Sequence, residues 1–475
     1  MNSENHSIAD MKSLFEAQRI AFASDTNPVH SLRKDRLDRL LAMTGKYQEA
    51  IAEAISADFG HRSRHETILA EIFVAFAGIR HARRHLSDWM RTRRVSTPLH
   101  FWPAWSRVMR QPLGVVGIVS PWNYPFQMAI APAIGALAAG NRVLLKPSEI
   151  TPCFSDLLHR IVAEFFAAEE MAVVTGDAEL ARAFVSMPFD HLLFTGSAAV
   201  GRQVAIAAAN NLTPVTLELS GKSPAILDAS CDLAEVAAKL AMGKLLNAGQ
   251  TCIAPDYVLL PEGREEDFIA ALRGAVARLY PTLAQNPDYS SIVDQRHYAR
   301  LVRLLEDARL KHARIIEINP GNEDFSASKR KMPLYIVLGG NDDMAVMQEE
   351  IFGPILPVLP VKDSQAAIDY VNRHPRPLAL YWFGTDRAQR DRILDRTISG
   401  GVTINDTLWH IAQEALPFGG VGASGSGAYH GETGFLTFTK EKPVFFQAKR
   451  NGASLLYPPY GRTFERILGL LKMIV

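Results

Sequence analysis

The chain has 475 residues, of which 48% are hydrophobic and 21% charged, and its formal net charge is +1 at pH 7. This balance is typical of a soluble globular protein, and the near-zero charge argues against a protein that binds nucleic acid electrostatically. Because the length exceeds that of one ordinary hydrophobic core, we expect two or three domains with a cleft between them.

The cysteines and the N-terminal segment indicate the compartment. The N-terminal residues MNSENHSIADMK are polar and lack the apolar core of a signal peptide, and no apolar run reaches the roughly 18 residues of a membrane helix. The three cysteines, Cys153, Cys231 and Cys252, cannot all pair and form no CxxC motif. We therefore expect free thiols and a cytoplasmic protein. His81 and His85 lie one helical turn apart, so both belong to one face of a predicted helix. We interpret the pair as part of that helix face and expect no metal site.

Residues 9–92 predict helices, because their apolar residues recur at three- and four-residue spacing. Residues 95–113 are rich in proline and aromatic residues, lack the helical period, and predict an excursion such as an antiparallel hairpin. From Val115 onward, short β-branched runs alternate with helical patterns. These runs are VVGIVS, RVLLKPS, MAVVTG, HLLFTGS and TPVTLELSG. The alternation is typical of a parallel sheet that is covered on both faces.

A second alternating series begins near Ser223 and predicts a second α/β unit. It contains the strand-like runs IAPDYVLLP, LPVLPV, LALYWFG and GGVTIND, separated by helical patterns. The run FLTFTKEKPVFFQ is strand-like and, together with residues 95–113, predicts a small bridging element. The final RTFERILGLLKMIV predicts an apolar helix too short to span a bilayer. Packing onto the body is its simpler interpretation, and an interfacial or substrate-gating helix is the alternative.

Two glycine-rich segments invite comparison with phosphate loops. Gly420, Gly422 and Gly425 match GxGxxG, but no strand precedes them and no helix follows, so we interpret them as places of close backbone approach. The segment GSAAVG, residues 196–201, does follow a predicted strand and open a predicted helix. Backbone N–H groups at a helix start bind anions, so this segment is either a phosphate or dinucleotide site or a plain turn. It is no Walker loop, because it lacks the required lysine.

Cys252 lies in NAGQTCIAPDYV, and its neighbours allow a buried filler, a metal ligand, a disulfide partner or a nucleophile. A nucleophilic thiol requires a stabilised thiolate, donors for an oxyanion and a base for water. Asn123, Lys146 and Glu218 stand at the ends of predicted strands, where ligands collect in parallel sheets. Each has a simpler interpretation, because Asn123 could cap a turn and the two charged groups could be solvated.

At this point the sequence resembles the aldehyde dehydrogenase family. The segments that carry the resemblance are SPWNYPF, AAGNRVLLKPSE, FTGSAAVG, LELSGKSP, NAGQTCIAPDYV, MQEEIFGP, SGGVTIND and LPFGGVGASGSGAYHG. They run in family order from about residue 110 to residue 440. The forms GQTCIAPDY, TPVTLEL and RPLALY resemble the class 3 branch, and within it the bacterial coniferyl-aldehyde dehydrogenases.

The resemblance implies a role for each candidate. Cys252 would be the nucleophile, the Asn123 side-chain amide and the Cys252 backbone N–H would stabilise the oxyanion, and Glu218 would activate water to hydrolyse the thioester. The cofactor would be NAD, with NADP as the alternative. Its expected contacts are Trp122, Lys146, Glu149, Gly196, Ser197, Gly201, Glu350 and Phe352. One residue departs from the family pattern, because Ser220 stands where the family usually has glycine. Its hydroxymethyl group could restrict Glu218 or add a hydrogen bond near the nicotinamide.

The implied fold is α/β and aldehyde dehydrogenase-like. It has a Rossmann-like cofactor domain, a catalytic domain with its own parallel sheet, and a small β oligomerisation element, and the protein would be a homodimer. We assign residues 1–94 and 114–220 to the NAD(P)-binding domain and residues 221–425 to the catalytic domain. Residues 95–113 and 426–450 would form the bridging element, and residues 451–475 a C-terminal helix.

The leading function is the oxidation of an aldehyde to its acid. Coniferaldehyde or a related aromatic aldehyde is the first expected substrate, and a medium- or long-chain aliphatic aldehyde is the second. Three other functions are weighed against it. A cofactor-independent cysteine amidohydrolase would use Glu218, Lys146 and Cys252. A non-catalytic scaffold conflicts with the retained Cys252 and Glu218, and a CoA-acylating enzyme conflicts with Glu218 as a base for water.

Overall fold

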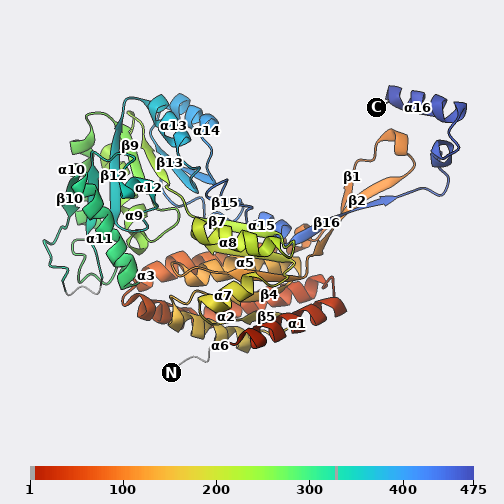
Figure 1. Ribbon diagram of the computed structural model, residues 1–475, viewed down its shortest axis with the longest axis horizontal. Helices are drawn as coiled ribbons and strands as arrows, with labels where there is room; N and C mark the ends of the chain where they lie inside the picture. The colour runs from red at the N-terminus through yellow and green to blue at the C-terminus, as the bar shows by residue number, and fades with distance from the viewer. Residues whose placement is uncertain (1–5, 327–329, 475) are drawn as a thin grey trace.

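The computed structural model describes residues 6–326 and 330–474, and its strands form three sheets. Figure 1 shows two lobes, each built around one large sheet, and a narrow arm that projects away from them. Within the described residues, no helix combines the length and the apolar character that crossing a membrane requires.

The N-terminal third of the first lobe is helical, as predicted. Ser7 caps the first helix with a capping box, and the second helix ends at Gly60, whose φ of 74° is unfavourable for other residues. One turn is π-helical, a local widening that often accompanies functional sites. The elements are α1 (Ile8–Ser24), α2 (His30–Phe59), α3 (Arg64–Thr67), the π-helical η1 (Ile68–Phe73) and α4 (Val74–Trp89).

The first large sheet has the strand order β15-β7-β6-β3-β4-β5 and is parallel except for the pairing of β15 with β7. Its strands are β3 (Val115–Val119), β4 (Arg142–Lys146), β5 (Met171–Val173), β6 (His191–Gly196), β7 (Val215–Leu219) and β15 (Gly425–Ser426). The helices α5 (Pro125–Ala139) and α6 (Pro152–Phe165) cover one face, while α1, α7 (Ala178–Val185) and α8 (Ala198–Ala209) cover the other. The strand order reverses between β3 and β6, so a ligand crevice is expected outside their carboxyl ends.

The second large sheet has the order β10-β11-β12-β9-β8-β13-β14 and is parallel except at β10. Its strands are β8 (Pro224–Leu227), β9 (Tyr257–Pro261), β10 (Arg314–Ile318), β11 (Leu334–Leu338), β12 (Ile355–Val361), β13 (Ala379–Phe383) and β14 (Gly401–Ile404). Its helices are α9 (Leu233–Leu245), α10 (Glu265–Leu279), α11 (Gln295–Leu310), α12 (Ala345–Gln348), α13 (Ser364–Arg373) and α14 (Arg387–Arg396). The prediction of two successive α/β units is confirmed.

The arm is a three-stranded antiparallel sheet of β1 (Arg93–Val95), β2 (Trp105–Pro112) and β16 (Thr439–Phe446), with the short helix η2 (Leu99–Phe101) at its tip. The predicted hairpin is confirmed. The run FLTFTKEKPVFFQ is a strand only from Thr439, because its first three residues end the helix α15 (Gly431–Thr437). The Phe435 ring is buried against the Trp89 ring, with 5.7 Å between centroids, which ties this part to the body.

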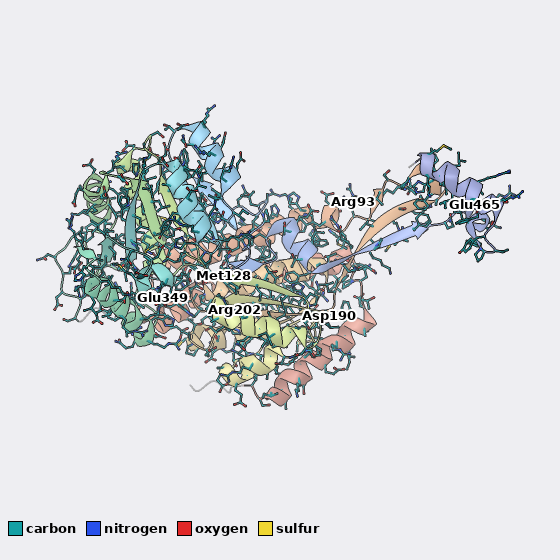
Figure 2. The ribbon with its side chains drawn as sticks, turned by 45° about the horizontal axis from the view of Figure 1, so that its top comes forward. Arg93, Met128, Asp190, Arg202, Glu349 and Glu465 are labelled. Atoms are coloured by element: carbon teal, nitrogen blue, oxygen red, sulfur yellow. The ribbon has the colours of Figure 1, made fainter. Side chains whose placement is uncertain are left out.

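The C-terminal helix α16 (Arg462–Ile474) follows the short η4 (Ala453–Leu456) and lies at the outer end of the arm, away from both lobes (Figure 1). Figure 2 shows the same separation through Glu465 on α16 and Arg93 on the arm. None of residues 462–473 is buried. The interpretation that this helix packs onto the body is therefore wrong for this chain.

Candidate active site

Cys252 lies where two cavities meet. One is a groove with about 1260 Å³ of open space that runs between the lobes, and the other is a pocket of about 830 Å³. Met128 lines both cavities with Cys252, and Figure 2 shows it at the centre of the molecule. The Cys252 thiol can therefore contact one ligand in the groove and another in the pocket.

The groove contains most of the predicted site residues. It is lined by Trp122, Asn123, Gly196, Ser197, Glu218, Ser220, Cys252, Glu350 and Phe352, among others. The residues come from the carboxyl ends of β3, β6 and β7, from the turn after α9 that carries Cys252, and from the loop before β12. The ring centroids of Trp122 and Phe352 are 5.4 Å apart, and Phe352 adopts a φ of 52°. A non-glycine residue held in this conformation is typical of functional sites.

The segment 196–201 forms the strand–turn–helix unit that its sequence predicts. β6 ends at Gly196, and the Ser197 hydroxyl caps α8 by accepting from the Val200 N–H at 3.4 Å. Ala199 in the first turn of α8 also lines the groove. A helix of this length presents free backbone N–H groups at its start, which suits the pyrophosphate of a dinucleotide.

Three predicted cofactor residues lie outside the groove lining. Lys146 is buried at the end of β4, where its Nζ donates to the Pro147 carbonyl at 2.8 Å and lies 3.7 Å from Glu149 Oε2. Gly201 lies one turn into α8, and a Cβ there would approach the Leu219 side chain to 2.4 Å. Gly201 therefore permits helix–strand packing. Since Lys146 lines neither cavity around Cys252, the structure does not bring together the Glu–Lys–Cys set of an amidohydrolase.

The turn that carries Cys252 has an unusual backbone. α9 ends at Leu245, and the 3-10 turn η3 (Leu246–Gly249) follows with Asn247 and Ala248 at φ values of 52° and 51°. Burial raises the pKa of the Cys252 thiol well above its usual range, and the carboxylates of Glu350 and Glu218 raise it further. The backbone N–H groups of Cys252 and Ile253 act in the opposite direction. A proton acceptor is therefore required to generate the thiolate.

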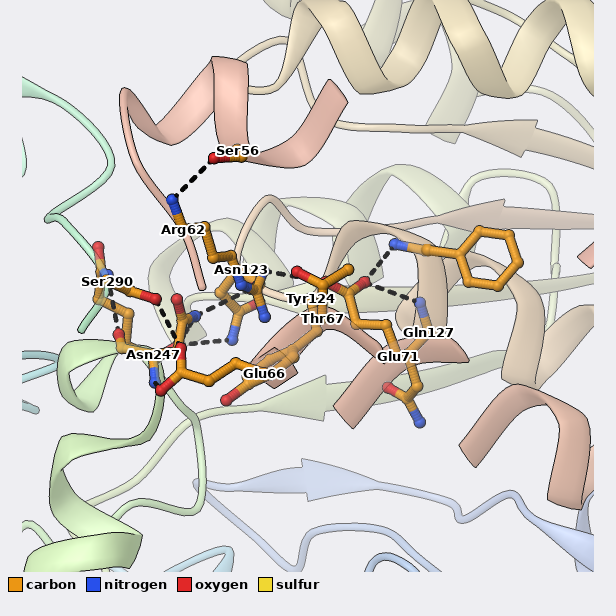
Figure 3. Close-up of polar contacts among 12 residues, drawn as sticks. Ser56, Arg62, Glu66, Thr67, Glu71, Asn123, Tyr124, Gln127, Asn247 and Ser290 are labelled. Carbon is orange, nitrogen blue, oxygen red and sulfur yellow. Dashed lines mark hydrogen bonds and ion pairs between the residues drawn. The ribbon is translucent and has the colours of Figure 1, made fainter. Parts of the chain in front are cut away.

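Asn123 is held next to this turn. The side-chain Nδ2 of Asn123 donates to the Gln250 carbonyl at 3.2 Å. The main-chain carbonyl of Asn123 accepts from Asn247 Nδ2 at 3.0 Å (Figure 3). Gln250 in turn donates to the Asn247 and Ser291 carbonyls at 2.9 and 3.0 Å. The side-chain amide is thus fixed beside Cys252 with a second N–H that remains for an oxyanion.

Glu218 lies within β7, opposite Gly425 of β15. Both oxygens of its carboxyl group are buried and have no hydrogen-bond partner among the described residues, and burial raises its pKa well above the usual range. A carboxyl group in this state serves as a general base once it has been deprotonated. The glycines of GVGASG have the structural role that we expected, because a Cβ at Gly425 would lie 2.3 Å from the Leu217 carbonyl oxygen.

Ser220 acts on Glu350 in this structure. Burial and the neighbouring Asp256 raise the pKa of Glu350 to about 8, and the polar side chain of Ser220 nearby lowers it. Of the two effects considered for Ser220, the structure favours the added hydrogen bond near the cofactor groove over a restraint on Glu218.

The loop that carries Glu350 is anchored by residues that the sequence did not reveal. Lys222 Nζ forms an ion pair with Asp256 and donates to the Glu349 carbonyl at 3.0 Å. The second Asp256 oxygen accepts from the Ile351 N–H at 2.9 Å, and Arg300 Nη1 donates to the Glu350 carbonyl at 3.1 Å. These contacts hold the Glu350 backbone from both sides.

The second cavity is apolar. Among the residues that the structure describes, those that line it are all uncharged. Its walls come from η1, the start of α4, α5, α9, the turn that carries Cys252 and the loop after β14. Its larger side chains are Leu69, Phe73, Tyr124, Met128, Met242, Leu246, Leu408, Trp409 and Ile411. A pocket of this kind binds a neutral, hydrophobic molecule.

Sequence reasoning missed a buried polar network under Asn123 that includes Arg62, Glu66 and Glu71, drawn in Figure 3. The available signal was the break FGHRSRHE, where charged residues interrupt a helical pattern directly after a glycine. Lys244 was also missed; burial lowers its pKa to about 8, and its Nζ has no hydrogen-bond partner within the described chain.

The other histidine and metal predictions concern regions away from Cys252. His81 and His85 share a half-buried face of α4, with ring centroids 4.5 Å apart, as predicted. Among residues 6–326 and 330–474, no group of three or more histidine, cysteine, aspartate or glutamate side chains is arranged to hold a metal ion.

Comparisons with known proteins agree with this geometry. A model described as "Aldehyde dehydrogenase family" matches residues 3–444. A probable coniferyl aldehyde dehydrogenase of Caulobacter vibrioides is 48% identical over 474 residues, covering 98% of each chain. A coniferyl aldehyde dehydrogenase of a Pseudomonas species is 48% identical over 446 residues, covering 94% of this chain and 92% of that protein.

A substrate-bound structure of an AldH of Staphylococcus aureus is 39% identical and superposes with a TM-score of 0.91, covering 97% of this chain and 99% of that one. The expected aldehyde dehydrogenase-like fold is thereby confirmed. Since the family model spans most of the chain, and relatives are almost half identical across nearly its whole length, the chain belongs to the aldehyde dehydrogenase family.

Proposed function

We propose that this aldehyde dehydrogenase oxidises aromatic aldehydes, with coniferaldehyde as the first substrate, and uses NAD⁺ as its cofactor. The observation that carries the proposal is the position of Cys252 between a polar groove and an uncharged pocket. The groove suits a dinucleotide because of the free helix start at Ser197 and the aromatic pair of Trp122 and Phe352.

The first chemical step is addition of the Cys252 thiolate to the aldehyde carbon. The thiol proton leaves to solvent through the groove that Cys252 lines, so the Glu218 carboxylate, which has no competing partner in the described chain, stays free for the later hydrolysis. The resulting thiohemiacetal oxyanion receives hydrogen bonds from Asn123 Nδ2 and from the Cys252 backbone N–H. An amide donor suits this task, because it carries no charge that would oppose the departure of a hydride.

Oxidation leaves a thioester on Cys252. A bound nicotinamide dinucleotide supplies the hydride acceptor for this step. Glu218 then removes a proton from water as the water oxygen attacks the acyl carbon, the carbon–sulfur bond breaks, and the acid is released. Glu350 borders the same groove, and with a pKa of about 8 it is mostly protonated at neutral pH.

We propose which residues contact each part of the dinucleotide. Glu350 and Phe352 would contact the nicotinamide and its ribose, Trp122 would line the same groove, and Gly196 and Ser197 the pyrophosphate. Lys146 and Glu149, at the end of β4, would contact the adenosine ribose. The carboxylate of Glu149 favours the 2′-hydroxyl of NAD⁺ over the 2′-phosphate of NADP⁺ by charge.

The choice of an aromatic substrate rests on the pocket and on the relatives. Phe73, Tyr124 and Trp409 supply three aromatic side chains to the pocket wall, which suits a flat ring. The two relatives at 48% identity are named as coniferyl aldehyde dehydrogenases, one of them as probable. Medium- and long-chain aliphatic aldehydes are the second candidate, supported by Met128, Met242 and the other aliphatic side chains of the pocket.

The test is a comparison of coniferaldehyde, benzaldehyde, hexanal and dodecanal, each with NAD⁺ and with NADP⁺. The proposal predicts the highest kcat/KM for coniferaldehyde with NAD⁺. A higher kcat/KM for hexanal or dodecanal would overturn the aromatic preference, and a higher value with NADP⁺ would overturn the cofactor preference.

We further propose that the protein is a cytoplasmic homodimer. The free thiols of Cys153, Cys231 and Cys252 support a reducing compartment. The arm carries exposed apolar side chains, including Phe101, Trp102 and Phe445, which support association with a second copy. The domain boundaries given above remain part of this proposal, with β1, β2 and β16 as the oligomerisation element.

A further inference from the structure

Arg62 is a buried cation directly beneath Asn123. Its Nη1 donates to the Asn123 carbonyl at 2.8 Å and lies 2.9 Å from Glu71 Oε1, and both side chains of this ion pair are fully buried. The second Glu71 oxygen accepts from the Phe126 and Gln127 N–H groups at 2.7 and 3.2 Å, at the start of α5. Figure 3 shows the pair joined to the segment that carries Asn123.

The guanidinium plane of Arg62 is also fixed by aromatic rings. Its Cζ lies 5.1 Å from the Phe59 ring centroid and 4.8 Å from that of Tyr124, the residue after Asn123. An arginine can satisfy a carboxylate, a carbonyl and two ring faces together because its charged group is planar. A lysine ammonium has the same charge but cannot reproduce this arrangement.

A second acidic residue of the same segment holds the Cys252 turn. Glu66 accepts from the Asn247 N–H at 3.1 Å and from the Ser290 hydroxyl at 2.5 Å. Asn247 Nδ2 then donates to the Asn123 carbonyl at 3.0 Å and to the Gln250 carbonyl at 3.2 Å. The Asn123 carbonyl therefore receives one hydrogen bond from Arg62 and one from the turn that carries Cys252.

We propose that Arg62 is a positioning residue for the oxyanion site, acting with Glu71 through the Asn123 backbone. This inference rests on the proposed role of the Asn123 amide. A buried ion pair seldom contributes more to stability than a well-packed apolar substitute, so stability alone does not account for the pair. What Arg62 and Glu71 provide is a fixed Asn123 main chain, with the oxyanion donor directed at the thiohemiacetal oxygen.

The burst rate should therefore depend on Arg62 and Asn123 jointly, although only Asn123 lines the groove. Displacement of a reacting or stabilising group by about 1 Å can cost roughly 100-fold in rate. We expect Arg62→Lys, which keeps the charge opposite Glu71, to slow the pre-steady-state burst of NADH by about tenfold to 100-fold. The burst reports thiohemiacetal formation and hydride departure, the steps that depend on the oxyanion.

The test is a double-mutant cycle of Arg62→Lys and Asn123→Ala, measured by stopped-flow NADH burst in the full-length protein. In the Asn123→Ala background, Arg62→Lys is expected to change the burst rate by less than about twofold, because the donor that it positions is gone. Effects that multiply fully in the double variant, or no effect of Arg62→Lys alone, would overturn the inference. An unchanged burst in Asn123→Ala would overturn the oxyanion role itself, and the inference with it.

Two further measurements distinguish a misplaced Asn123 from a general disruption of the site around Cys252. Alkylation by iodoacetamide needs the Cys252 thiolate but no oxyanion, so its rate at Cys252, followed by peptide mass spectrometry, should be the same in Arg62→Lys and the wild type. Arg36→Lys is the matched control: Arg36 is equally buried and pairs with Glu170 at 3.1 Å, outside both cavities. It should leave the burst unchanged.

Glu71→Gln provides a second variant in case Arg62→Lys does not fold. Its amide oxygen can still accept from the Phe126 and Gln127 N–H groups, while the charge opposite Arg62 is lost. The inference predicts a slower burst in the Asn123 background and little change in the Asn123→Ala background. A slower alkylation of Cys252 together with the slower burst would contradict it.

Discussion

Ser220 is the residue at which this chain departs from the family pattern that its sequence resembles. Its side chain lines the groove and interacts with Glu350, whereas the Glu218 carboxyl group has no hydrogen-bond partner among the described residues. The consequence of the added hydroxyl should therefore be seen in cofactor binding, while thioester hydrolysis should be unaffected.

We expect Ser220→Gly to raise the KM for NAD⁺ by about threefold to tenfold, the range set by the loss of one hydrogen bond. The ratio of burst rate to steady-state rate, which reports hydrolysis of the thioester, should not change. Stopped-flow and steady-state kinetics at saturating aldehyde check both values. A changed ratio with a constant KM would instead connect Ser220 to Glu218.

Glu66 makes stability depend on pH in an unusual direction. Burial raises its pKa from 4.5 to about 7, although Ser290 and Arg62 oppose the rise. Since the folded protein binds this proton more tightly than the unfolded chain, the contribution to stability is full below about pH 4.5 and is lost as the pH rises through about 7. The difference between the two pKa values corresponds to about 3 kcal/mol.

Glu66→Gln removes this titration, so its Tm relative to the wild type should rise between pH 5 and pH 8 and then stay level. Differential scanning fluorimetry across this range measures the difference. A Tm difference for Glu66→Gln that is constant from pH 5 to pH 8 would refute the assignment.

At the scale of elements, α9 and the loop after β14 pack too closely for any side chain at Gly243. A Cβ there would lie 2.3 Å from Thr407 Oγ1, and Thr407 lines the apolar pocket. On α10, a Cβ at Gly274 would meet only the end of the Arg278 side chain, at 3.7 Å. The two helical glycines therefore differ in what an added side chain would meet.

We predict that Gly243→Ala displaces the Thr407 loop, destabilises the protein by about 1–3 kcal/mol and raises the KM for coniferaldehyde. Gly274→Ala should instead stabilise the protein by about 0.5–1 kcal/mol, because alanine favours a helix interior, and leave the KM unchanged. Thermal unfolding and steady-state kinetics of the pair test this. Similar behaviour of the two variants would contradict the close packing.

The elements were predictable where periodicity and burial agree. The strands β3, β4, β6 and β9 are short apolar runs because both faces of their sheets are covered, and each follows or precedes a helical pattern. The beginning of FLTFTKEKPVFFQ was predicted as a strand, but burial of Phe435 against Trp89 makes it part of a helix. Short apolar runs do not distinguish the two structures.

The candidate site was predictable only in part. Asn123, Glu218 and Cys252 stand in turn-rich surroundings, and they do line one groove. Arg62 and Glu71 look like the solvent-facing charges of an amphipathic helix, and nothing local shows that they pair beneath a residue about 60 positions away. Contacts of this separation depend on the tertiary fold and carry no periodic signal.

At the scale of the molecule, the arm and α16 leave apolar side chains in contact with solvent. Trp102 and Phe445 lie on the arm, and Leu470 and Met473 lie on α16. A group of exposed apolar side chains of this kind is typical of an interface. An interface with a second copy accounts for the position of α16 away from the lobes, because the helix then need not pack onto the lobes of its own chain.

Sedimentation velocity should give a mass about twice the 52.4 kDa of one chain. Phe445→Asp should raise the dimer dissociation constant by at least about tenfold, because an aromatic side chain at an interface centre carries much of the binding energy. Leu310→Asp, at an exposed apolar position on α11 away from the arm, is the control and should leave the mass unchanged. A monomeric wild type at micromolar concentration would contradict the proposed homodimer.

The central claim is that Cys252 forms two successive covalent intermediates with the substrate carbon, a thiohemiacetal and then a thioester, and that Glu218 activates the water that hydrolyses the thioester. A single stopped-flow experiment with Glu218→Gln, NAD⁺ and coniferaldehyde tests it directly, with Cys252→Ala as the reference. We predict a burst of NADH close to one per active site followed by a stall, an acyl adduct on the Cys252 peptide, and no burst in Cys252→Ala. Steady-state turnover of Glu218→Gln at the wild-type rate, or a burst that survives in Cys252→Ala, would contradict the account.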